Sequence, residues 1–182
     1  VAKAAEGAGH GETAELLARK SAFLNPTAFV VRCLVYAVVW SLLARYFLRS
    51  SLAQDESGDV KLTERMQFWS GISMVLFALT VTFFTFDVIM SLAPIWFSTI
   101  FGVYYFAGSM VGFFALLALS MAWLQGRGLM SHSITVEHFH DVGKLLFGFV
   151  VFWAYIAFSQ YMLIWYANIP EETFWYAARQ GS

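Results

Sequence analysis

The stretch from residue 137 to residue 173, EHFHDVGKLLFGFVVFWAYIAFSQYMLIWYANIPEET, decides how this chain has to fold. It opens with ionisable side chains, continues as a long apolar run, and closes on a polar turn that contains Asn168 and Pro170. A helix crosses the hydrocarbon core of a bilayer in roughly 20 apolar residues. The apolar middle is long enough for that, so we expect it to be a transmembrane helix.

One face of this expected helix carries a broken row of polar side chains. At 100° per residue the following residues share that face, which we call the polar stripe: Lys144, Gly148, Val151, Tyr155, Ser159, Met162 and Tyr166. Polar side chains inside a membrane usually face other protein or a water-filled cavity. The helix is therefore predicted to belong to a bundle that conducts protons or holds an amphiphilic ligand.

The composition supports the same class of protein. Of the 182 residues, 59% are hydrophobic and 13% are charged, and a typical soluble domain has a charged fraction of about 25%. The chain is therefore predicted to be an integral membrane protein. It has no basic run or patch, so we expect no binding to nucleic acid. Its single cysteine, Cys33, excludes a disulfide within the chain, a cysteine-ligated iron–sulfur cluster and a C-x-x-C-H haem attachment.

The hydrophobic pattern predicts an all-α fold with two regions. Residues 1–26 form an N-terminal arm and a membrane-surface segment, and residues 27–182 form a transmembrane helical bundle. The Asn25–Pro26 pair is typical of a helix start and would begin the first membrane segment. We expect four transmembrane helices, which form part of a larger bundle and cover about residues 29–48, 67–89, 97–124 and 143–167.

The charges of the connections predict how the chain is oriented. The first connection, residues 49–65, and the third, residues 125–140, contain Lys or Arg, whereas the second, residues 90–96, contains neither. Cytoplasmic loops are enriched in Lys and Arg. We therefore expect the first and third connections on the cytoplasmic side and the second on the outer side.

Asp87 is the sharpest single candidate for chemistry. It ends an apolar stretch near the outer end of the second segment, and Ser73 and Thr80 share its helical face at seven-residue intervals. An Asp in hydrocarbon costs roughly 3 kcal/mol on insertion scales, so such a residue often serves a function. One hypothesis is a proton-relay or quinol-contacting carboxylate. The other is a helix-end residue bonded to the backbone of the following turn.

A second candidate group lies where the fourth segment begins. It comprises Glu137, His138, His140, Asp141 and Lys144. Histidine titrates near neutral pH, so a helix start that carries His, carboxylates and Lys at the membrane surface suits proton entry. The alternative is a solvated helix start with capping side chains. We favour capping for Glu137 and His138, and proton entry for His140, Asp141 and Lys144.

Three further features have weaker signals. Glu171 and Glu172 follow the fourth segment and are either proton-release groups or solvated acids after a Pro turn. Tyr104 fits an aromatic belt at the membrane interface first and a ligand contact second. The stretch from Gly108 to Gly112 is a G-x-x-x-G pattern, which lets helices approach closely.

We expect no redox metal in this chain. On a helix His138 and His140 point in nearly opposite directions, and no cysteine joins them. A membrane b-type haem needs axial ligands well inside the bilayer. The histidines here lie in the N-terminal arm or in the third connection.

The chain resembles the ActF family, the second membrane-spanning quinone-type subunit of bacterial alternative complex III, within the NrfD/polysulfide-reductase superfamily. The matching stretches are KSAFLN (20–25), FDVIMSLAPIWFSTIFGVYYFAG (86–108), HFHDVGKLLFGF (138–149) and FWAYIAFSQYMLIWYANIPEET (152–173). The resemblance covers nearly everything after Lys20. Val88 departs from the aromatic residue that this family has after the Asp. The family's subunits are longer, with about ten spanning helices, and this chain looks like their middle portion.

The resemblance implies a multi-pass subunit in the bacterial inner membrane. Its complex would oxidise menaquinol or ubiquinol and pass electrons through an iron–sulfur subunit and c-type haem subunits to a periplasmic acceptor or a terminal oxidase. A paralogous membrane subunit would hold the quinol, and this chain would bind no cofactor itself. The first hypothesis is a non-catalytic scaffold with a proton path along Lys144, Tyr155, Ser159 and Asp87. The alternatives are direct quinone binding at Asp87 or a nearby Tyr, a purely structural membrane anchor, and a free-standing transporter.

Overall fold

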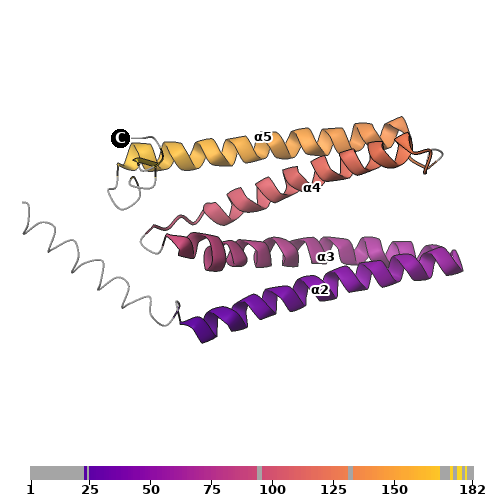
Figure 1. Ribbon diagram of the computed structural model, residues 1–182, viewed down its shortest axis with the longest axis horizontal. Coiled ribbons are helices and arrows are strands. Elements are labelled where there is room, and N and C mark those ends of the chain that lie inside the picture. Colours follow the sequence, from indigo (N-terminus) through magenta and orange to yellow (C-terminus); the bar gives the residue numbers. More distant parts are fainter. Residues whose placement is uncertain are drawn as a thin grey trace, which may run out of the picture. The chain divides into compact units, whose positions relative to one another are not determined.

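The fold is helical, as predicted, in a computed structural model that describes Phe23, residues 25–93, 96–130 and 133–168, Thr173, Tyr176, Ala177 and Arg179. Figure 1 shows its long helices, which are α2 (Pro26–Ser57), α3 (Val60–Phe84), α4 (Phe101–Gly126) and α5 (Val136–Ala167). Among the described residues, four helical stretches are long and apolar enough to cross a membrane. The prediction of four spanning helices in a multi-pass membrane protein is thus confirmed.

Three of the long helices, α2, α3 and α5, are longer than the apolar segments that predicted them, whereas α4 begins at Phe101 and not at the expected residue 97. The first begins at Pro26, where the Asn25 side chain accepts a hydrogen bond from the Thr27 amide at 2.9 Å. It continues to Ser57, so most of the expected first connection is helix rather than loop. Residues such as Arg, Leu, Ala and Gln favour helix even when they are too polar for hydrocarbon. At about 1.5 Å per residue, α2 is about 48 Å long, so its ends extend beyond a hydrocarbon core of about 30 Å.

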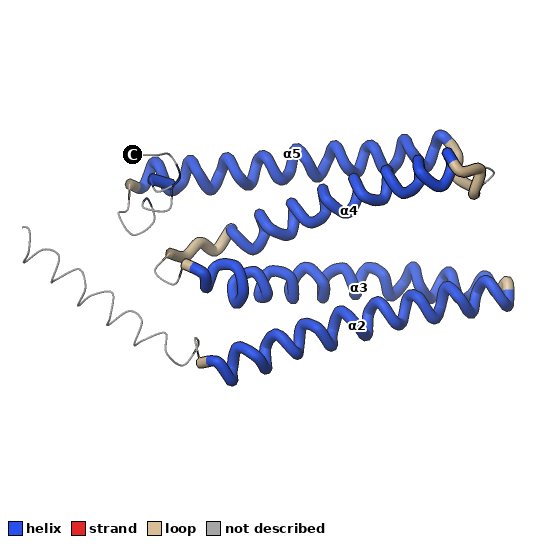
Figure 2. Tube along the Cα trace, in the orientation of Figure 1, coloured by secondary structure: helices blue, strands red, loops and turns tan. Residues whose placement is uncertain are grey.

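A tight turn joins α2 to α3. Gly58 takes a φ of 65°, a left-handed conformation that glycine adopts without steric cost. Asp59 then caps α3 by accepting a hydrogen bond from the Lys61 amide at 3.0 Å. The tan segment between the two helices is correspondingly short in Figure 2.

The chain divides into two compact units, Val1–Phe97 and Ser98–Ser182, and each is described by itself. In the first unit α2 and α3 form an antiparallel pair, which we call the first hairpin. Aromatic side chains fill the space between its helices. The Trp40 ring lies 5.1 Å from that of Phe84 and 6.1 Å from that of Phe77, measured between centroids.

The end of α3 departs from α-helical geometry. Residues Thr85–Ile89 form a π-helical turn, and Met90–Leu92 follow as a 3-10 turn. The Thr85 hydroxyl donates to the Val81 carbonyl at 2.7 Å, a type of bond that bends helices. Such π turns occur frequently at functional sites. The turn contains neither Gly nor Pro, so the sequence did not predict it.

In the second unit α4 and α5 form the second hairpin, which is held by close aromatic packing. The rings of Phe114 and Phe149 stack with centroids 5.5 Å apart. A methyl group placed on Gly108 would lie 3.2 Å from Nε1 of Trp153, so the helices approach closely there, as the G-x-x-x-G pattern predicts. A methyl group placed on Gly112 would have no neighbouring atom within 4 Å, so the second glycine of the pattern does not contribute to this contact.

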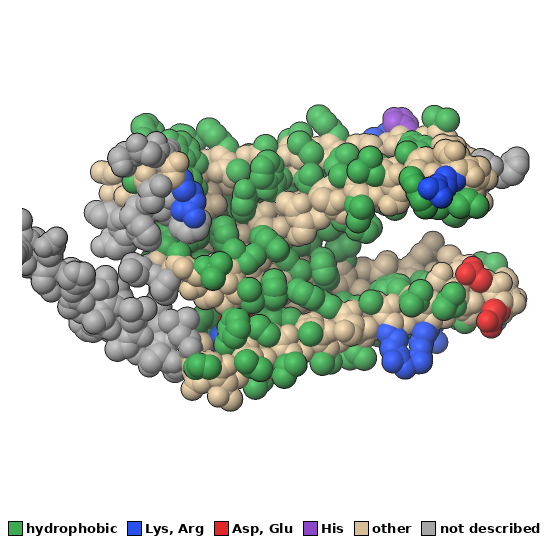
Figure 3. Space-filling model, viewed as in Figure 1, with side chains coloured by type: hydrophobic (Ala, Val, Ile, Leu, Met, Phe, Trp, Pro, Cys, Tyr) green, Lys and Arg blue, Asp and Glu red, His purple; other side chains and the backbone are tan. Residues whose placement is uncertain are grey.

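The outer flanks of both hairpins are apolar. In Figure 3 the sides of α2 and α3 are largely green, whereas red and blue side chains gather toward the end with the Gly58 turn. Large side chains such as Phe68 and Leu119, each 69% exposed, point outward. Exposed apolar surface of this extent fits lipid or further membrane helices. The sidedness of the helices stays a prediction.

Candidate functional site

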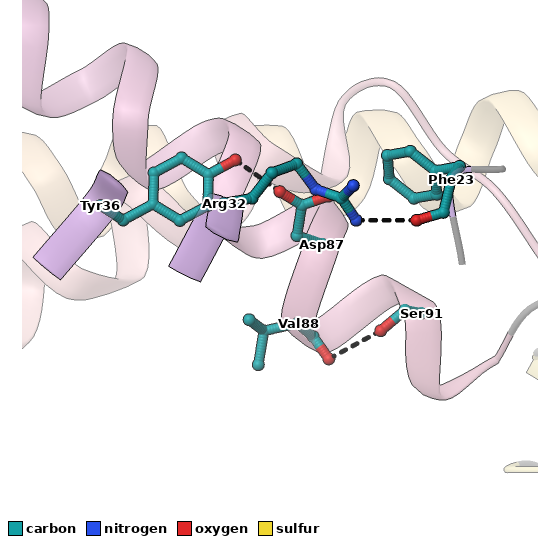
Figure 4. A network of polar contacts seen from close by, with 6 residues as sticks. All are labelled: Phe23, Arg32, Tyr36, Asp87, Val88 and Ser91. Carbon is teal, nitrogen blue, oxygen red and sulfur yellow. Dashed lines mark hydrogen bonds and ion pairs between the residues drawn. The ribbon is translucent and has the colours of Figure 1, made fainter. Parts of the chain in front are cut away.

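The site is a three-residue cluster around Asp87, which we call the Asp87 cluster (Figure 4). Asp87 lies in the π turn at the end of α3, and its side chain is 4% exposed. Its Oδ1 is 3.0 Å from Nε of Arg32, and its Oδ2 accepts a hydrogen bond from the Tyr36 hydroxyl at 2.5 Å. Each carboxylate oxygen is therefore engaged by a side chain of α2.

The hairpin topology brings these side chains together. Arg32 and Tyr36 are one helical turn apart, so they share a face of α2. Arg32 lies near the beginning of α2, and Asp87 lies just beyond the end of α3. The beginning of one helix and the end of the next meet at the same level in an antiparallel hairpin. Neither Arg32 nor Tyr36 was predicted to pair with Asp87, although the equal height of a first helix start and a second helix end in an antiparallel hairpin could have suggested it.

Arg32 is held on a second side by the chain that precedes α2. Its Nη2 donates to the Phe23 carbonyl at 2.9 Å, and its guanidinium carbon lies 4.3 Å from the centroid of the Phe23 ring. A guanidinium over an aromatic face gains electrostatic attraction. The arginine thus joins α2, the π turn and residue 23, as the dashed contacts in Figure 4 show.

The electrostatics of the cluster favour a paired carboxylate. A charge in a low-dielectric interior is costly unless a partner of opposite charge and further hydrogen bonds compensate it. Arg32 supplies the charge and Tyr36 supplies a hydrogen bond. These contacts differ from the hypothesis of a helix-end residue bonded to the following turn, because the carboxylate turns toward α2.

The polar face predicted on α3 follows the same side of the helix. Thr80 accepts a hydrogen bond from Nε1 of Trp40 at 2.9 Å. Ser73 lines a cavity of about 350 Å³ together with Trp40 and Phe77. Together with Asp87, these residues all face α2. The polar side chains of α3 therefore contribute to the contact between the helices of the first hairpin.

The ionisable group at the start of α5 does not converge into one site. The Thr135 amide donates to Nδ1 of His138 at 3.1 Å, so His138 caps the helix, in agreement with the favoured hypothesis. Lys144 and Asp141 form an ion pair at 3.4 Å, with side chains 61% and 69% exposed. Exposed pairs of this kind contribute little to stability. Glu137 and His140 are also exposed.

The polar stripe lies on the side of α5 that does not pack against α4. Tyr155 is 64% and Tyr166 is 85% exposed, and Ser159 is half-buried. The buried face carries Gln160 instead, which is 5% exposed and donates from Nε2 to the Ser98 hydroxyl at 3.2 Å. Gln160 was not among the predicted site residues, although it is adjacent to Ser159 and is a polar residue within the apolar run.

Of the remaining candidate residues, the structure describes Tyr104 and not the two C-terminal glutamates. Tyr104 stacks on Trp153 with ring centroids 5.6 Å apart and lines a cavity beside Gln160. Glu171, Glu172, His132 and the arm up to residue 22 lie outside the described residues. Within the described ranges, no group of three or more His, Cys, Asp or Glu side chains is placed to hold a metal ion.

Two comparisons with known proteins bear on identity. No model of a known protein family matches the chain, and no curated protein sequence matches it either. The assignment of function therefore depends on the residues and on the geometry given above.

Proposed function

We propose that this chain is a non-catalytic membrane subunit of a quinol-oxidising electron-transfer complex and that it acts as a scaffold. The resemblance of its sequence stretches to the ActF family supports this assignment. The complex would lie in a bacterial inner membrane and use menaquinol or ubiquinol. Its other subunits would be a paralogous quinol-binding membrane subunit, an iron–sulfur subunit and c-type haem subunits, with a terminal oxidase as a further partner.

The Asp87 cluster is the observation that supports the scaffold role most directly. A carboxylate that contacts a quinol needs open surface for its partner, whereas the Asp87 side chain is 4% exposed. Arg32 and Tyr36 already engage both oxygens of Asp87. The cluster therefore suits a fixed electrostatic link between α2 and the end of α3. The exposed apolar flanks of both hairpins would then receive partner helices and lipid.

Proton conduction is a second candidate, and the polar stripe of α5 favours it. Lys144 and Tyr155 are exposed on a face that α4 does not cover. Helices of a partner subunit could complete a polar path there, because intramembrane polar residues usually face other protein or water. In this case the path would follow α5, and Asp87 would stay a structural residue.

The transporter alternative has less support. Transporter sites are typically built from pairs of interrupted helices in two related halves. In the described part of the chain, one membrane segment carries an irregular turn, at Thr85–Leu92, and it lies near the end of that segment. A single interruption near a helix end does not make such a pair.

The first experiment follows quinol oxidation and proton release by the purified complex in liposomes, with wild type and Asp87→Asn compared. For a scaffold, we expect a lower yield of assembled complex but unchanged turnover and unchanged protons per electron in the complex that remains. Lys144→Met tests the second candidate, because it would lower the proton yield at unchanged turnover if the stripe conducts protons.

Other outcomes would replace the proposal. Loss of turnover in intact Asp87→Asn complex would assign Asp87 to quinol chemistry. A lower proton yield at normal turnover in that variant would place Asp87 on the proton path. Purification of the chain without any iron–sulfur or haem subunit would remove the whole assignment.

A further inference from the structure

The side of α2 that faces away from α3 carries a pair of arginines in the half nearer the Gly58 turn. The residues that pack toward α3 recur at alternating steps of four and three and are Tyr36, Trp40, Leu43 and Phe47. Arg45 and Arg49 follow Leu43 and Phe47 by two positions each, which is a rotation of about 200° around the helix. Both arginines are exposed. They therefore lie on the outer side of α2, one helical turn apart.

The rest of this side of α2 is apolar. The same alternating steps connect the residues of one face, which we call the outer stripe: Val31, Val35, Val38, Leu42, Arg45 and Arg49. The three valines and Leu42 are each more than half exposed. Val31 and Leu42 are eleven positions apart, or about 16 Å along the axis, and one leaflet supplies about half of a hydrocarbon core of about 30 Å. The outer stripe thus joins an apolar surface of one leaflet's depth to two positive charges.

The spacing of charges along α2 places the arginine pair at the membrane surface. Between Pro26 and Arg45 the one charged residue is Arg32, which is paired with Asp87. Pro26 and Arg45 are nineteen positions apart, or about 28 Å along the axis, which is close to the thickness of a hydrocarbon core. With the start of α2 at one boundary of the core, Arg45 lies at the other. Arg49, about 6 Å farther along the axis, then lies among the lipid headgroups.

The arginine pair is open to an anion. Within the part of the chain that the structure describes, neither guanidinium forms an ion pair or a hydrogen bond. The nearest acids on α2, Asp55 and Glu56, lie six and seven positions beyond Arg49, or about 9–10 Å along the axis, and the Debye length at physiological salt is about 8 Å. In Figure 3 the blue side chains in this half of α2 lie farther from the Gly58 turn than the red ones. Two guanidiniums one turn apart suit a phosphate, whose oxygens guanidinium N–H groups bind in bidentate fashion.

We propose that the outer stripe binds an anionic phospholipid, with the phosphate between Arg45 and Arg49 and an acyl chain along the valines and Leu42. The lipid is anionic rather than zwitterionic because arginines at the membrane surface are attracted to anionic leaflets. The proposal needs only that the chain spans a membrane, so it does not depend on the proposed role in quinol oxidation. The bound lipid would cover the side of α2 that α3 leaves open.

Native mass spectrometry of the full chain in a nonionic detergent tests the proposal. The probes are dioctanoyl phosphatidylglycerol and dioctanoyl phosphatidylcholine, which share the acyl chains and the phosphate but differ in net charge. We expect wild type to bind the phosphatidylglycerol about fivefold or more tightly than the phosphatidylcholine. The double variant Arg45→Gln with Arg49→Gln should weaken phosphatidylglycerol binding by about tenfold or more and remove this preference, because both positive charges are lost.

Lys61→Gln with Arg65→Gln is the matched control, because this pair is also exposed and one turn apart but lies on α3. Gln54 bonds to Thr63, which lies between the two control residues, so these residues are level with Gln54. That level is seven positions beyond the middle of the arginine pair, or about 10 Å along the axis. The control removes the same charge and should leave the affinity for phosphatidylglycerol within about twofold.

The exposed position of both arginines means that the double variant should fold, and its melting temperature in detergent checks this. If it does not fold, the salt dependence of wild type decides the question. From about 50 to about 500 mM ammonium acetate, the affinity for phosphatidylglycerol should fall by about threefold or more while that for phosphatidylcholine stays nearly constant, because salt screens exposed charges. An equal response of the two lipids to salt would contradict the proposal.

Five results would overturn the proposal. Three of them are equal binding of both lipids by wild type, unchanged binding by the double arginine variant, and an equal loss in the control variant. Competition by inorganic phosphate with an affinity equal to that of phosphatidylglycerol would assign the arginine pair to free anions. A photoactivatable label on Leu42→Cys, in a Cys33→Ala background and in native membranes, should capture lipid. Capture of a protein subunit and no lipid would assign the outer stripe to a partner helix.

Discussion

The two hairpins have helices of similar length and apolarity, but each hairpin joins its own two helices by different interactions. In the first hairpin polar side chains join the helices at three levels. These are Gln54 with Thr63 near the Gly58 turn, Trp40 with Thr80, and the Asp87 cluster. In the second hairpin the described contacts are mainly stacked rings and the close approach at Gly108.

This difference shows two ways to define helix register in a membrane. Lipid is as apolar as leucine, so apolar side chains alone do not drive helices together in a bilayer. The first hairpin uses pairs of polar side chains. Each of these side chains would be costly to leave in hydrocarbon without a hydrogen-bond partner. The second uses a glycine that admits Trp153 and so gains dispersion contacts.

The largest effect should come from Asp87→Ala, which leaves Arg32 without its carboxylate partner. Removing one member of a buried ion pair costs about 3–5 kcal/mol, and we expect the lower end because the Arg32 side chain is 26% exposed. Denaturant unfolding of the chain in bicelles measures the loss. The matched control is the double variant Arg32→Met with Asp87→Leu, which should recover most of the stability. A double variant as unstable as Asp87→Ala would show that the pair is not the reason for the loss.

A smaller effect is expected from Gly108→Leu in the second hairpin. The side chain has to displace Trp153, and overpacking costs about 1–3 kcal/mol. Gly112→Ala is the control because a methyl group there meets nothing within 4 Å. It should be neutral or stabilise the helix by up to about 1 kcal/mol. The comparison of melting temperatures in detergent checks both, and equal losses would refute the close fit at Gly108.

The smallest effect is the coupling between Trp40 and Thr80. Trp40→Phe keeps the aromatic contacts with Phe77 and Phe84 but removes the Nε1–H donor. Hydrogen bonds between membrane helices contribute about 0.6 kcal/mol on average. A double-mutant cycle with Thr80→Val should give a coupling of that size. A coupling of zero would leave the Asp87 cluster as the main polar link of the first hairpin.

Much of the fold could be predicted from the sequence, and particular residues show where prediction stopped. Asn25 and Pro26 correctly marked the first helix start, and the apolar runs gave all four helices. The end of α2 at Ser57 and the start of α3 at Val60 were not predicted. Residues of high helix propensity continue each helix beyond the part that is apolar enough for hydrocarbon. The π turn at Thr85–Ile89 has no local signal, since a π turn depends on what its side chains contact.

The candidate site was predicted only in part. Asp87 stood out because a carboxylate in an apolar run is costly, and the sequence alone identifies that cost. Its partners Arg32 and Tyr36 were not assigned, because they are 55 and 51 positions away and periodicity within one segment does not reach them. For α5, the residues of the polar stripe share one side of the helix, but the sequence did not indicate which side packs on α4, and Gln160 was overlooked.

The sequence by itself determined that this is a helical membrane protein, because the length and apolarity of a segment decide whether it can span a bilayer. It also determined which residues are costly to bury. Only the tertiary structure decided how that cost is met: Asp87 by Arg32 and Tyr36, and Gln160 by Ser98. The physical reason is that burial is a property of one residue, whereas compensation needs a partner that only the antiparallel packing of two helices supplies.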